Sequence, residues 1–596
     1  MKRCPECRRD YYNDSLFYCL DDGNALLEGP ASGSRFPDEP ATAILSEPGA
    51  VATGFGDGEE PQTAILSEPP ASTGGQVDGE NPTRPFIKTT AAEPQKSISE
   101  ASEKQSLSVN KAAKPLLAVT VLALIVLGGF FGYRYFNSST KQIDSIAVMP
   151  FVNESGNADV EYLSDGMTET LIKSLSQIPD LNVRPRSSVF RYKGKETDPQ
   201  TIGKELNVQA ILNGRIIQRG QDISLFVELI DISLDKVIWS QQYNRKQSDL
   251  VTLQSDVARD VLSNLKTKLS GTDEAKVTKT YTTNPEAYQL YLKGNYYRTK
   301  YNKDGYKKAI EYYKQAIELD PNYAMAYVGI GASYFLAAGW YLPPNEAMPQ
   351  SKDAALKALD LDESLAEAHS LIASYEVWYG WNWENAEKEA KRAIELNPKV
   401  GHDQYSYYLA AMGRMDRSIE EMELYQSLFP LDLVANSSLA NMYLYGGQTE
   451  KAIEQARKTI ELDQNYAPGY KALGLAYARK QMYPEAIASL EKAYSLDTTP
   501  ELMGYEGYVY AAAGKKVEAL RIAEELQSTF SKFAPDYNIA GIYAKLNDNE
   551  KAFEWINKAI DHRAGPIAFV KVDPLFDNIR SDARYKDVLK RMNLPE

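Results

Sequence analysis

The sequence predicts a multidomain protein in which a small α/β domain precedes an all-helical array of repeats. Three observations support this prediction: an uncharged apolar segment at Leu116–Tyr133, mixed strand and helix patterns at 141–271, and a helical pattern that recurs from about residue 286. The length of 596 residues also indicates about three to five domains. The formal charge of −15 argues against a broad basic surface for nucleic acid, so direct nucleic-acid binding is not expected.

All three cysteines, Cys4, Cys7 and Cys19, lie within the first twenty residues, and Asp22-Gly23 stands where a second C-x-x-C pair would end. Two such pairs on tight turns form a tetrahedral thiolate site. Residues 1–28 therefore resemble a bacterial zinc ribbon, and the resemblance implies one zinc ion held by these three cysteines and Asp22. A ribbon that has lost its metal and a redox-active Cys4–Cys7 pair are the alternatives. A redox pair needs the strand–helix junction of a larger fold, which this stretch lacks.

Residues 29–114 have the composition of a disordered acidic linker. Within 31–100 there are nine prolines and 11 acidic against 4 basic residues, too little apolar surface for a core. The heptapeptide TAILSEP occurs twice, and Thr42 and Thr63 each have a leucine three residues later. This pattern resembles phosphothreonine ligands of forkhead-associated domains, which implies phosphorylation at both threonines. A duplicated spacer is the alternative.

Residues 115–136 are predicted to form one transmembrane helix. The 18 uncharged residues of Leu116–Tyr133 lie between Lys114 and Arg134, and this length just crosses a hydrocarbon core of about 30 Å. A buried core helix is the alternative. Gly128 and Gly132 form a G-x-x-x-G step, which favours a homodimer through close helix contact.

The predicted location is the bacterial inner membrane, with the chain crossing it once. The first thirty residues lack the apolar region of a secretory signal, so the apolar helix would act as the signal anchor. A thiolate metal site suits a reducing cytoplasm, whereas the cysteine-free remainder suits an oxidising periplasm. We therefore expect residues 1–114 in the cytoplasm and the later domains outside it.

Residues 141–271 alternate strand and helix patterns. DSIAVMPFV predicts a buried strand, and EYLSDGMTETLIKSLSQI predicts a helix with Ser164 or Asp165 as its N-cap. A second strand at LNVRPRS, a short helix at TIGKELNV, three strands within AILNGRIIQRGQDISLFVELIDISLDKVIWSQQY and a closing helix are predicted to follow.

The same region carries a family resemblance over about 130 residues. The motifs SIAVMPF, NESG, DGMTETL, IPDLNVRPRSSVFRYKG, LNVQAILNGRI, ELID, VIW and LQSDVA occur in order and resemble the TolB amino-terminal-like domain. The resemblance implies a small α/β domain that contributes to partner contact and has no catalytic residues.

From about 286 onward, segments such as AIELDP, AIELNP and TIELD recur. Their equivalent leucines are separated by 42, 35, 66 and 34 residues, and SLFP at 427–430 divides the longest step. A period near 34 with helix–turn–helix chemistry is typical of tetratricopeptide repeats. In the clearest unit, Gly474 and Ala486 are small where two helices touch, and Tyr470 and Tyr477 fill the space between units.

The predicted solenoid covers 286–562 and contains about eight units, followed by a polar capping helix in 563–596. LPPNEAMP is expected to loosen the turn of the second unit. The predicted units are 290–321, 323–362, 366–398, 399–430, 433–463, 467–497, 500–531 and 533–562.

Catalytic signatures are absent from the sequence, which contains no GxxxxGK[ST], HExxH, GxSxG or HRD motif. We therefore predict that the protein is not an enzyme. His402-Asp403 is interpreted as an incidental pair. Trp378, Trp381 and Trp383 could form an aromatic binding surface, but packing in a lengthened turn is the favoured interpretation.

These predictions combine into a membrane-anchored scaffold or sensor that binds a protein or peptide. Its ligand would lie across several repeats and contact groove-facing residues of the first helices, for example Asn441, Tyr445, Lys471 and Arg479. The alternative is a one-component transmembrane regulator whose cytoplasmic zinc ribbon delivers the output.

Overall fold

The computed structural model describes residues 143–178, 180–265, 275, 277–530 and 535–595, with three two-residue strands near the amino terminus. The chain divides into two compact units, Met1–Val109 and Asn110–Glu596. In the first unit, β1 (Lys2–Arg3) pairs antiparallel with β2 (Asp10–Tyr11) and β3 (Leu27–Glu28). The predicted zinc ligands, the TAILSEP repeats and the apolar segment with Gly128 and Gly132 lie outside the described residues. None of the described helices is long and apolar enough to cross a bilayer.

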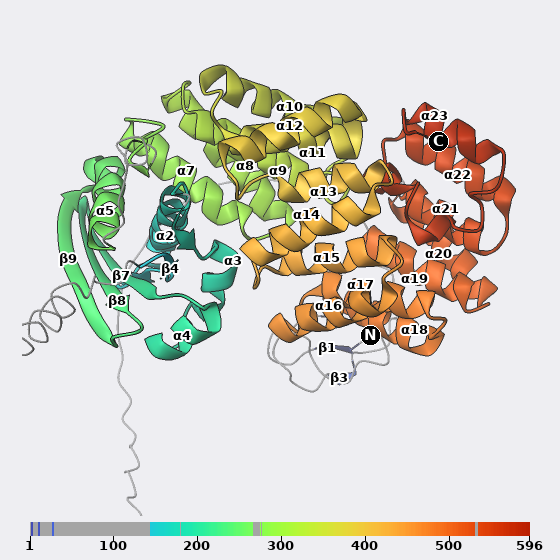
Figure 1. Ribbon diagram of the computed structural model, residues 1–596, viewed down its shortest axis with the longest axis horizontal. Helices are drawn as coiled ribbons and strands as arrows, with labels where there is room; N and C mark the ends of the chain where they lie inside the picture. The colour runs from blue at the N-terminus through green and yellow to red at the C-terminus, as the bar shows by residue number, and fades with distance from the viewer. Residues whose placement is uncertain are drawn as a thin grey trace, which may run out of the picture. The chain divides into compact units, whose positions relative to one another are not determined.

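The second unit begins with a mixed sheet (Figure 1). Strand β4 pairs in parallel with β6 and β7, β5 also pairs with β7, and β7, β8 and β9 form an antiparallel meander, as the alternating apolar pattern predicts. Helices α2 and α5 contact each other and the first repeat helix, so they lie between the sheet and the repeats. The strands are β4 (Ser145–Val148), β5 (Val152–Asn153), β6 (Asn182–Val183), β7 (Ala210–Arg219), β8 (Asp222–Asp231) and β9 (Lys236–Lys246). The helices are α2 (Glu161–Leu175), α3 (Arg186–Val189), α4 (Pro199–Leu206) and α5 (Leu250–Asn264).

The predicted N-cap of α2 is wrong. The helix begins at Glu161, after a 3-10 turn at Ala158–Val160 whose cap is Asn157, so Ser164 and Asp165 lie inside the helix. Asp165 is buried and pairs with Lys193 at 2.5 Å. The ion pair with Lys193, and not helix capping, therefore determines the position of the Asp165 side chain.

Helix pairs form the remainder of the unit, at the positions that the repeat period predicts. Consecutive helices make the most extensive contacts in this region, as antiparallel pairs of a solenoid do. The first helices are α7 (Pro285–Arg298), α9 (Ala324–Ala337), α11 (Ala366–Tyr375), α13 (His402–Ala411), α15 (Leu433–Tyr445), α17 (Ala467–Arg479), α19 (Pro500–Ala512) and α21 (Asp536–Lys545). The second helices are α8 (Lys303–Leu319), α10 (Pro344–Leu361), α12 (Trp383–Leu396), α14 (Met415–Leu428), α16 (Thr449–Leu462), α18 (Tyr483–Leu496), α20 (Lys516–Phe530) and α22 (Asn549–Asp561).

Most of LPPNEAMP is helix and does not loosen the turn of the second repeat. Pro344 occupies the first turn of α10, where a missing N–H costs nothing, and Pro349 lies inside the helix. The extra length of this repeat therefore consists of the connection 338–343 and the 18-residue helix that follows.

The tail, which we define as residues 563–595, differs from the predicted polar capping helix. It contains 3-10 turns at Gly565–Phe569 and Pro574–Phe576, and only Arg584–Arg591 (α23) is α-helical. Its apolar side chains are buried, and the indole nitrogen of Trp383 in the third repeat donates a 2.8 Å hydrogen bond to the Met592 carbonyl. The tail therefore packs back onto earlier repeats.

Buried side chains form two main cores. The first core joins the sheet domain to the first two repeats and the start of the third. The second core joins the rest of the solenoid to the tail. The two cores meet within α11, between Ile372 and Ala373.

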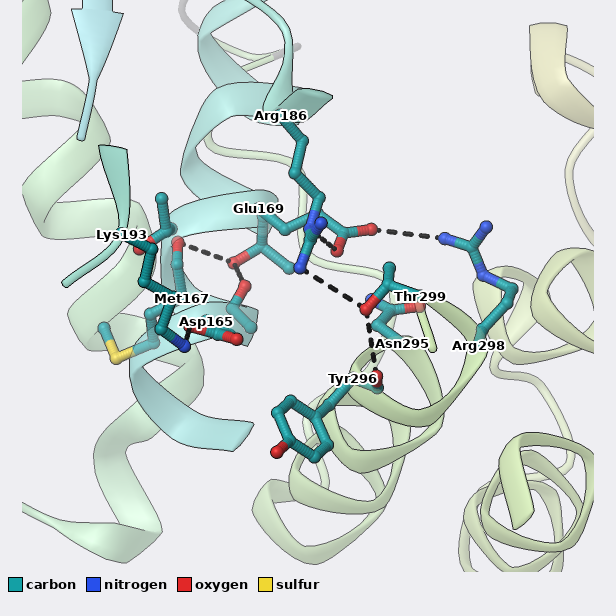
Figure 2. A network of polar contacts seen from close by, with 12 residues as sticks. Asp165, Met167, Glu169, Arg186, Lys193, Asn295, Tyr296, Arg298 and Thr299 are labelled. Carbon is teal, nitrogen blue, oxygen red and sulfur yellow. Dashed lines mark hydrogen bonds and ion pairs between the residues drawn. The ribbon is translucent and has the colours of Figure 1, made fainter. Parts of the chain in front are cut away.

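A junction of charged side chains holds the sheet domain on the repeats (Figure 2). Glu169 of α2 forms an ion pair with Arg186 at 3.1 Å and accepts a hydrogen bond from Arg298 of α7 at 3.2 Å. About one turn of helix away from this contact, Gly166 allows close approach, because a Cβ there would lie 2.9 Å from the Cβ of Leu292. An ion pair and a close contact between α2 and α7 thus both hold the sheet domain on the first repeat.

Candidate functional site

The main candidate site is a pocket of about 720 Å³ inside the solenoid. Its walls come from the first helices α13, α15, α17, α19 and α21, from the second repeat near Trp340, and from the tail. First helices line the interior of a solenoid because each repeat packs its second helix on the outside. Pockets with mainly aromatic and apolar walls and a few polar groups are typical ligand sites.

The four groove residues predicted from the sequence all line this pocket. Asn441 and Tyr445 lie one turn apart on α15, and Lys471 and Arg479 lie on the same face of α17. The amide of Asn441 makes no hydrogen bond within the described part of the chain. Lys471 pairs with Glu501 at 2.9 Å and Arg479 with Asp577 at 3.1 Å. The structure thus brings the four residues together, and their binding role remains a prediction.

An aromatic cluster, centred on Phe569 of the tail, forms one wall. The ring of Phe569 lies 5.0 Å from Trp378, 5.8 Å from Tyr407 and 5.9 Å from Tyr445, measured between ring centroids. Tyr407 shares a 2.8 Å hydrogen bond with Ser438, and burial raises the pKa of its phenol to about 12. The cluster therefore presents neutral, rigid rings to the pocket.

A buried carboxyl group, Asp573, lies beside this wall. Its two oxygens accept hydrogen bonds from the Tyr537 hydroxyl at 2.5 Å and from the Leu575 N–H at 2.9 Å. Burial raises the pKa of Asp573 and raises the pKa of Tyr537 well above its ordinary value. The Asp573 carboxyl thus caps the 3-10 turn at Pro574–Phe576, next to the pocket wall.

The pocket has a small positive surplus. Four basic residues line it against three acidic ones. Lys545 and Arg563 have no carboxylate partner within the described residues. The guanidinium of Arg563 lies 4.0 Å from the Trp381 ring and donates to the Tyr379 carbonyl at 3.0 Å. A ligand with an acidic group would balance this surplus.

The tryptophans of YEVWYGWNW have different positions. Trp381 and Trp383 are buried, which agrees with the packing interpretation, whereas Trp378 lines the pocket. The segment forms a π-helical turn at Glu376–Gly380 and leaves it through Trp381 at a φ of 58°. Its lengthened turn thus supplies one ring to the candidate site.

His402 and Asp403 make the contacts of residues with a structural role. His402 contacts Glu421 of the next helix at 2.8 Å, and burial raises the pKa of the Asp403 carboxyl. Within the described residues there is no group of three or more His, Cys, Asp or Glu side chains that could hold a metal ion. The predicted zinc set (Cys4, Cys7, Cys19 and Asp22) and the predicted phosphorylation sites Thr42 and Thr63 fall outside those residues.

Sequence reasoning missed the contribution of the tail and of the second repeat to the pocket. The run PIAFVKVDPLF in the tail is apolar, which is a signal that conflicts with a polar cap. Trp340 lies in a connection outside the repeat period, so periodicity carries no information about it.

Comparison with known families shows that the chain carries tetratricopeptide repeats. Residues 300–337 match a TPR repeat family, and residues 467–500 and 537–562 match a second tetratricopeptide repeat family. Residues 141–260 match the family described as HilA/YgeH-like transcriptional regulator, second domain. This description differs from the TolB amino-terminal-like resemblance expected from the motifs.

Curated relatives share parts of the chain. A Rhizobium meliloti (strain 1021) protein named "Putative adenylate cyclase 3" is 29% identical over 236 residues, which cover 39% of this chain and 40% of the relative. The Arabidopsis thaliana "TPR repeat-containing thioredoxin TDX" is 30% identical over 90 residues, 15% of this chain and 24% of the relative. The chain thus spans less than half the length of either relative.

Solved structures that match parts of this chain include that of Pseudomonas aeruginosa pilF. It shares 16% identity and a TM-score of 0.28, covering 35% of this chain and 92% of that one. YrrB, described as a TPR protein with an unusual peptide-binding site, shares 19% identity and a TM-score of 0.22, covering 31% and 92%.

Proposed function

We propose that this protein is a binding protein without catalytic activity, whose solenoid holds an extended segment of a partner protein in the pocket that the first helices line. The observation that carries the proposal is the convergence of five first helices and the tail on one pocket of about 720 Å³. Tetratricopeptide repeats bind peptide or protein partners through such surfaces.

The pocket wall favours a particular kind of peptide. Its aromatic rings suit an apolar or aromatic side chain, and its basic surplus suits an acidic side chain. Two buried donors of the wall, Trp378 Nε1 and Asn538 Nδ2, have no acceptor within the described residues. The backbone carbonyls of an extended peptide would supply acceptors after small side-chain shifts.

Selection of peptides from a random dodecamer library on the full chain tests this proposal. The selected peptides should contain apolar and acidic residues, and Asn441→Leu should weaken their binding about tenfold, as loss of one hydrogen bond predicts. Asn465→Leu, at an exposed turn between α16 and α17, is the matched control and should change nothing. Equal binding by Asn441→Leu and the wild type would contradict the proposal.

We further propose that the solenoid is anchored in the bacterial inner membrane by residues 115–136 and carries a zinc ribbon at 1–28. The support is the 18-residue uncharged segment and the cysteine spacing. Single cysteines at Ser34 and Ser531 test the orientation, because an impermeant maleimide should label only the second in intact spheroplasts. Cobalt titration of the full chain should give thiolate charge-transfer bands, and their absence would exclude the metal site.

A second candidate function is transmembrane regulation of transcription. The match of residues 141–260 to a domain of HilA/YgeH-like transcriptional regulators favours it. In this case the zinc ribbon would contact the transcription machinery. Co-purification of RNA polymerase with the full chain, but not with a Cys4→Ser, Cys7→Ser variant, would favour regulation over scaffolding.

A further inference from the structure

A separate cavity of about 240 Å³ lies at the junction between the sheet domain and the repeats. Helix α2 supplies one side, and the first helices α7, α9 and α11 of three successive repeats supply the others. Its polar lining consists of Glu169, Thr170, Lys173, Tyr291, Asn295, Arg298, Glu367 and Ser370. Cavities between domains are frequent ligand sites because both sides contribute groups.

Charge is unbalanced around this cavity. Lys173 pairs with Glu367 at 2.8 Å, and Arg186 and Arg298 share the single carboxylate of Glu169 (Figure 2). Two cations and two carboxylates line the cavity, and Arg186, which lies outside the lining, is a third cation that shares Glu169. The side chains of the Glu169 cluster are only 19% to 25% exposed, so water compensates the remaining positive charge poorly.

Some hydrogen-bond donors of the lining also lack an acceptor. The Nε of Arg298 is buried and has no hydrogen-bond acceptor within the described part of the chain. The buried Tyr313 hydroxyl donates to Asn295 Oδ1 at 2.7 Å, which leaves the Asn295 amide nitrogen as a donor. Lys173 donates to Glu367 and to the sulfur of Met325 at 3.9 Å, a weak acceptor.

The floor of the cavity is made of small residues. Gly329 and Ala332 of α9 contribute to it, and a Cβ at Gly329 would lie 2.5 Å from the Tyr313 ring. The Tyr313 ring thus fills the space on one side of Gly329, and the cavity lies on the other side. The volume is below the range of about 300–1,000 Å³ typical for drug-sized ligands, so a smaller molecule fits.

We propose that this cavity binds a small organic anion that presents carboxylate or phosphate oxygens to Arg298, Lys173 and Asn295. The anion supplies both the missing negative charge and the missing acceptors. Because the ligand would contact α2 and α7 together, its binding would stabilise the docking of the sheet domain on the repeats. The site is independent of the peptide pocket, which shares none of these lining residues.

Calorimetry and thermal unfolding of the full chain test the proposal at constant chloride, with succinate and inorganic phosphate as probes and neutral succinamide as the ligand control. At least one of the two anions should bind with a stoichiometry of one and raise the midpoint of thermal unfolding, and succinamide should do neither. Binding by succinate alone identifies a carboxylate site, and binding by phosphate alone identifies a phosphate site. No binding of either anion at 10 mM, roughly the weakest affinity of functional relevance, would overturn the proposal.

Three variants separate the site from general electrostatics. Arg298→Gln should weaken anion binding at least about tenfold, as loss of a charge-assisted hydrogen bond predicts. Ala332→Leu keeps every charge but fills the floor, so it should abolish binding even where Arg298→Gln is too unstable to measure. Arg521→Gln removes an exposed arginine that pairs with Glu525 on α20, and should bind like the wild type. Unchanged binding by Ala332→Leu would show that the anion lies elsewhere.

Discussion

Segments that are not repeats cover both ends of the repeat array, but different kinds of contact hold them there. At the first core, ion pairs of Glu169 with Arg186 and Arg298 add to the buried apolar side chains that join the sheet domain to the repeats. At the second core the tail is held by aromatic rings around Phe569. Ion pairs respond to salt and pH, whereas ring packing responds mainly to volume. The first end is therefore suited to sensing small charged molecules and the second to shaping a pocket.

The largest expected effect comes from removing the ring at the centre of the second core. Phe569→Ala should lower the free energy of unfolding by about 3–5 kcal/mol, because a buried ring leaves a cavity. Urea unfolding of the full chain measures this loss, and hydrogen exchange should accelerate in the second core only. Leu424→Ala, at a side chain that is 44% exposed, is the control and should cost less than about 0.5 kcal/mol.

A smaller effect is expected at the first core from adding volume. Gly166→Val should cost about 1–3 kcal/mol, because the new Cβ would meet Leu292 and force α2 away from α7. Hydrogen exchange should then accelerate in the sheet domain and the first repeat and leave the tail unchanged. Thr252→Val on the exposed side of α5 should be silent. Equal acceleration in both cores would show that they unfold as one unit.

The smallest effect concerns pH at the same junction. The amine of Lys399 donates to the Leu181 carbonyl at 2.8 Å, and burial lowers its pKa to about 8. An unfolded lysine has a pKa of about 10.4, so between these values the unfolded chain holds a proton that the folded chain has released. The free energy of unfolding should therefore rise between about pH 8 and about pH 10.4, by up to about 2.5 kcal/mol.

Lys399→Met should abolish this rise, since methionine carries no titrating amine. Thermal unfolding at pH 7.5 and pH 10 measures the difference, and Lys480→Met, at a more exposed lysine, is the control. If the free energy of unfolding changed with pH in the same way in the wild type and in the Lys399→Met variant, the assignment would be wrong.

Periodicity allowed most of the fold to be predicted. The recurring leucines locate the helix pairs because each repeat meets the same neighbours, and the alternating residues of β7 and β8 locate the meander because one face is buried. The groove positions on α15 and α17 follow from the same argument. Local signals failed where tertiary partners decided the structure, as Asp165 shows by pairing with Lys193 instead of capping α2.

The remaining parts of the site lacked a periodic signal. Phe569 and Asp573 belong to a tail that occurs once, so no internal copy shows which face they bury. The junction cavity depends on Glu169, Arg298 and Glu367. These residues lie on three different elements and are up to 198 residues apart along the chain. Only the three-dimensional packing of these elements makes them neighbours.

The hydrogen bond from Trp383 to the Met592 carbonyl has a consequence for biosynthesis. Its partners are separated by 209 residues, so this contact cannot form until Met592 has left the ribosome. An ordinary solenoid can fold repeat by repeat during translation, because each unit needs only its neighbour. Here the third repeat makes one of its contacts only after the tail has been synthesised, and long-range contacts of this kind slow folding. Nascent chains would therefore expose the aromatic interior until the tail has been synthesised.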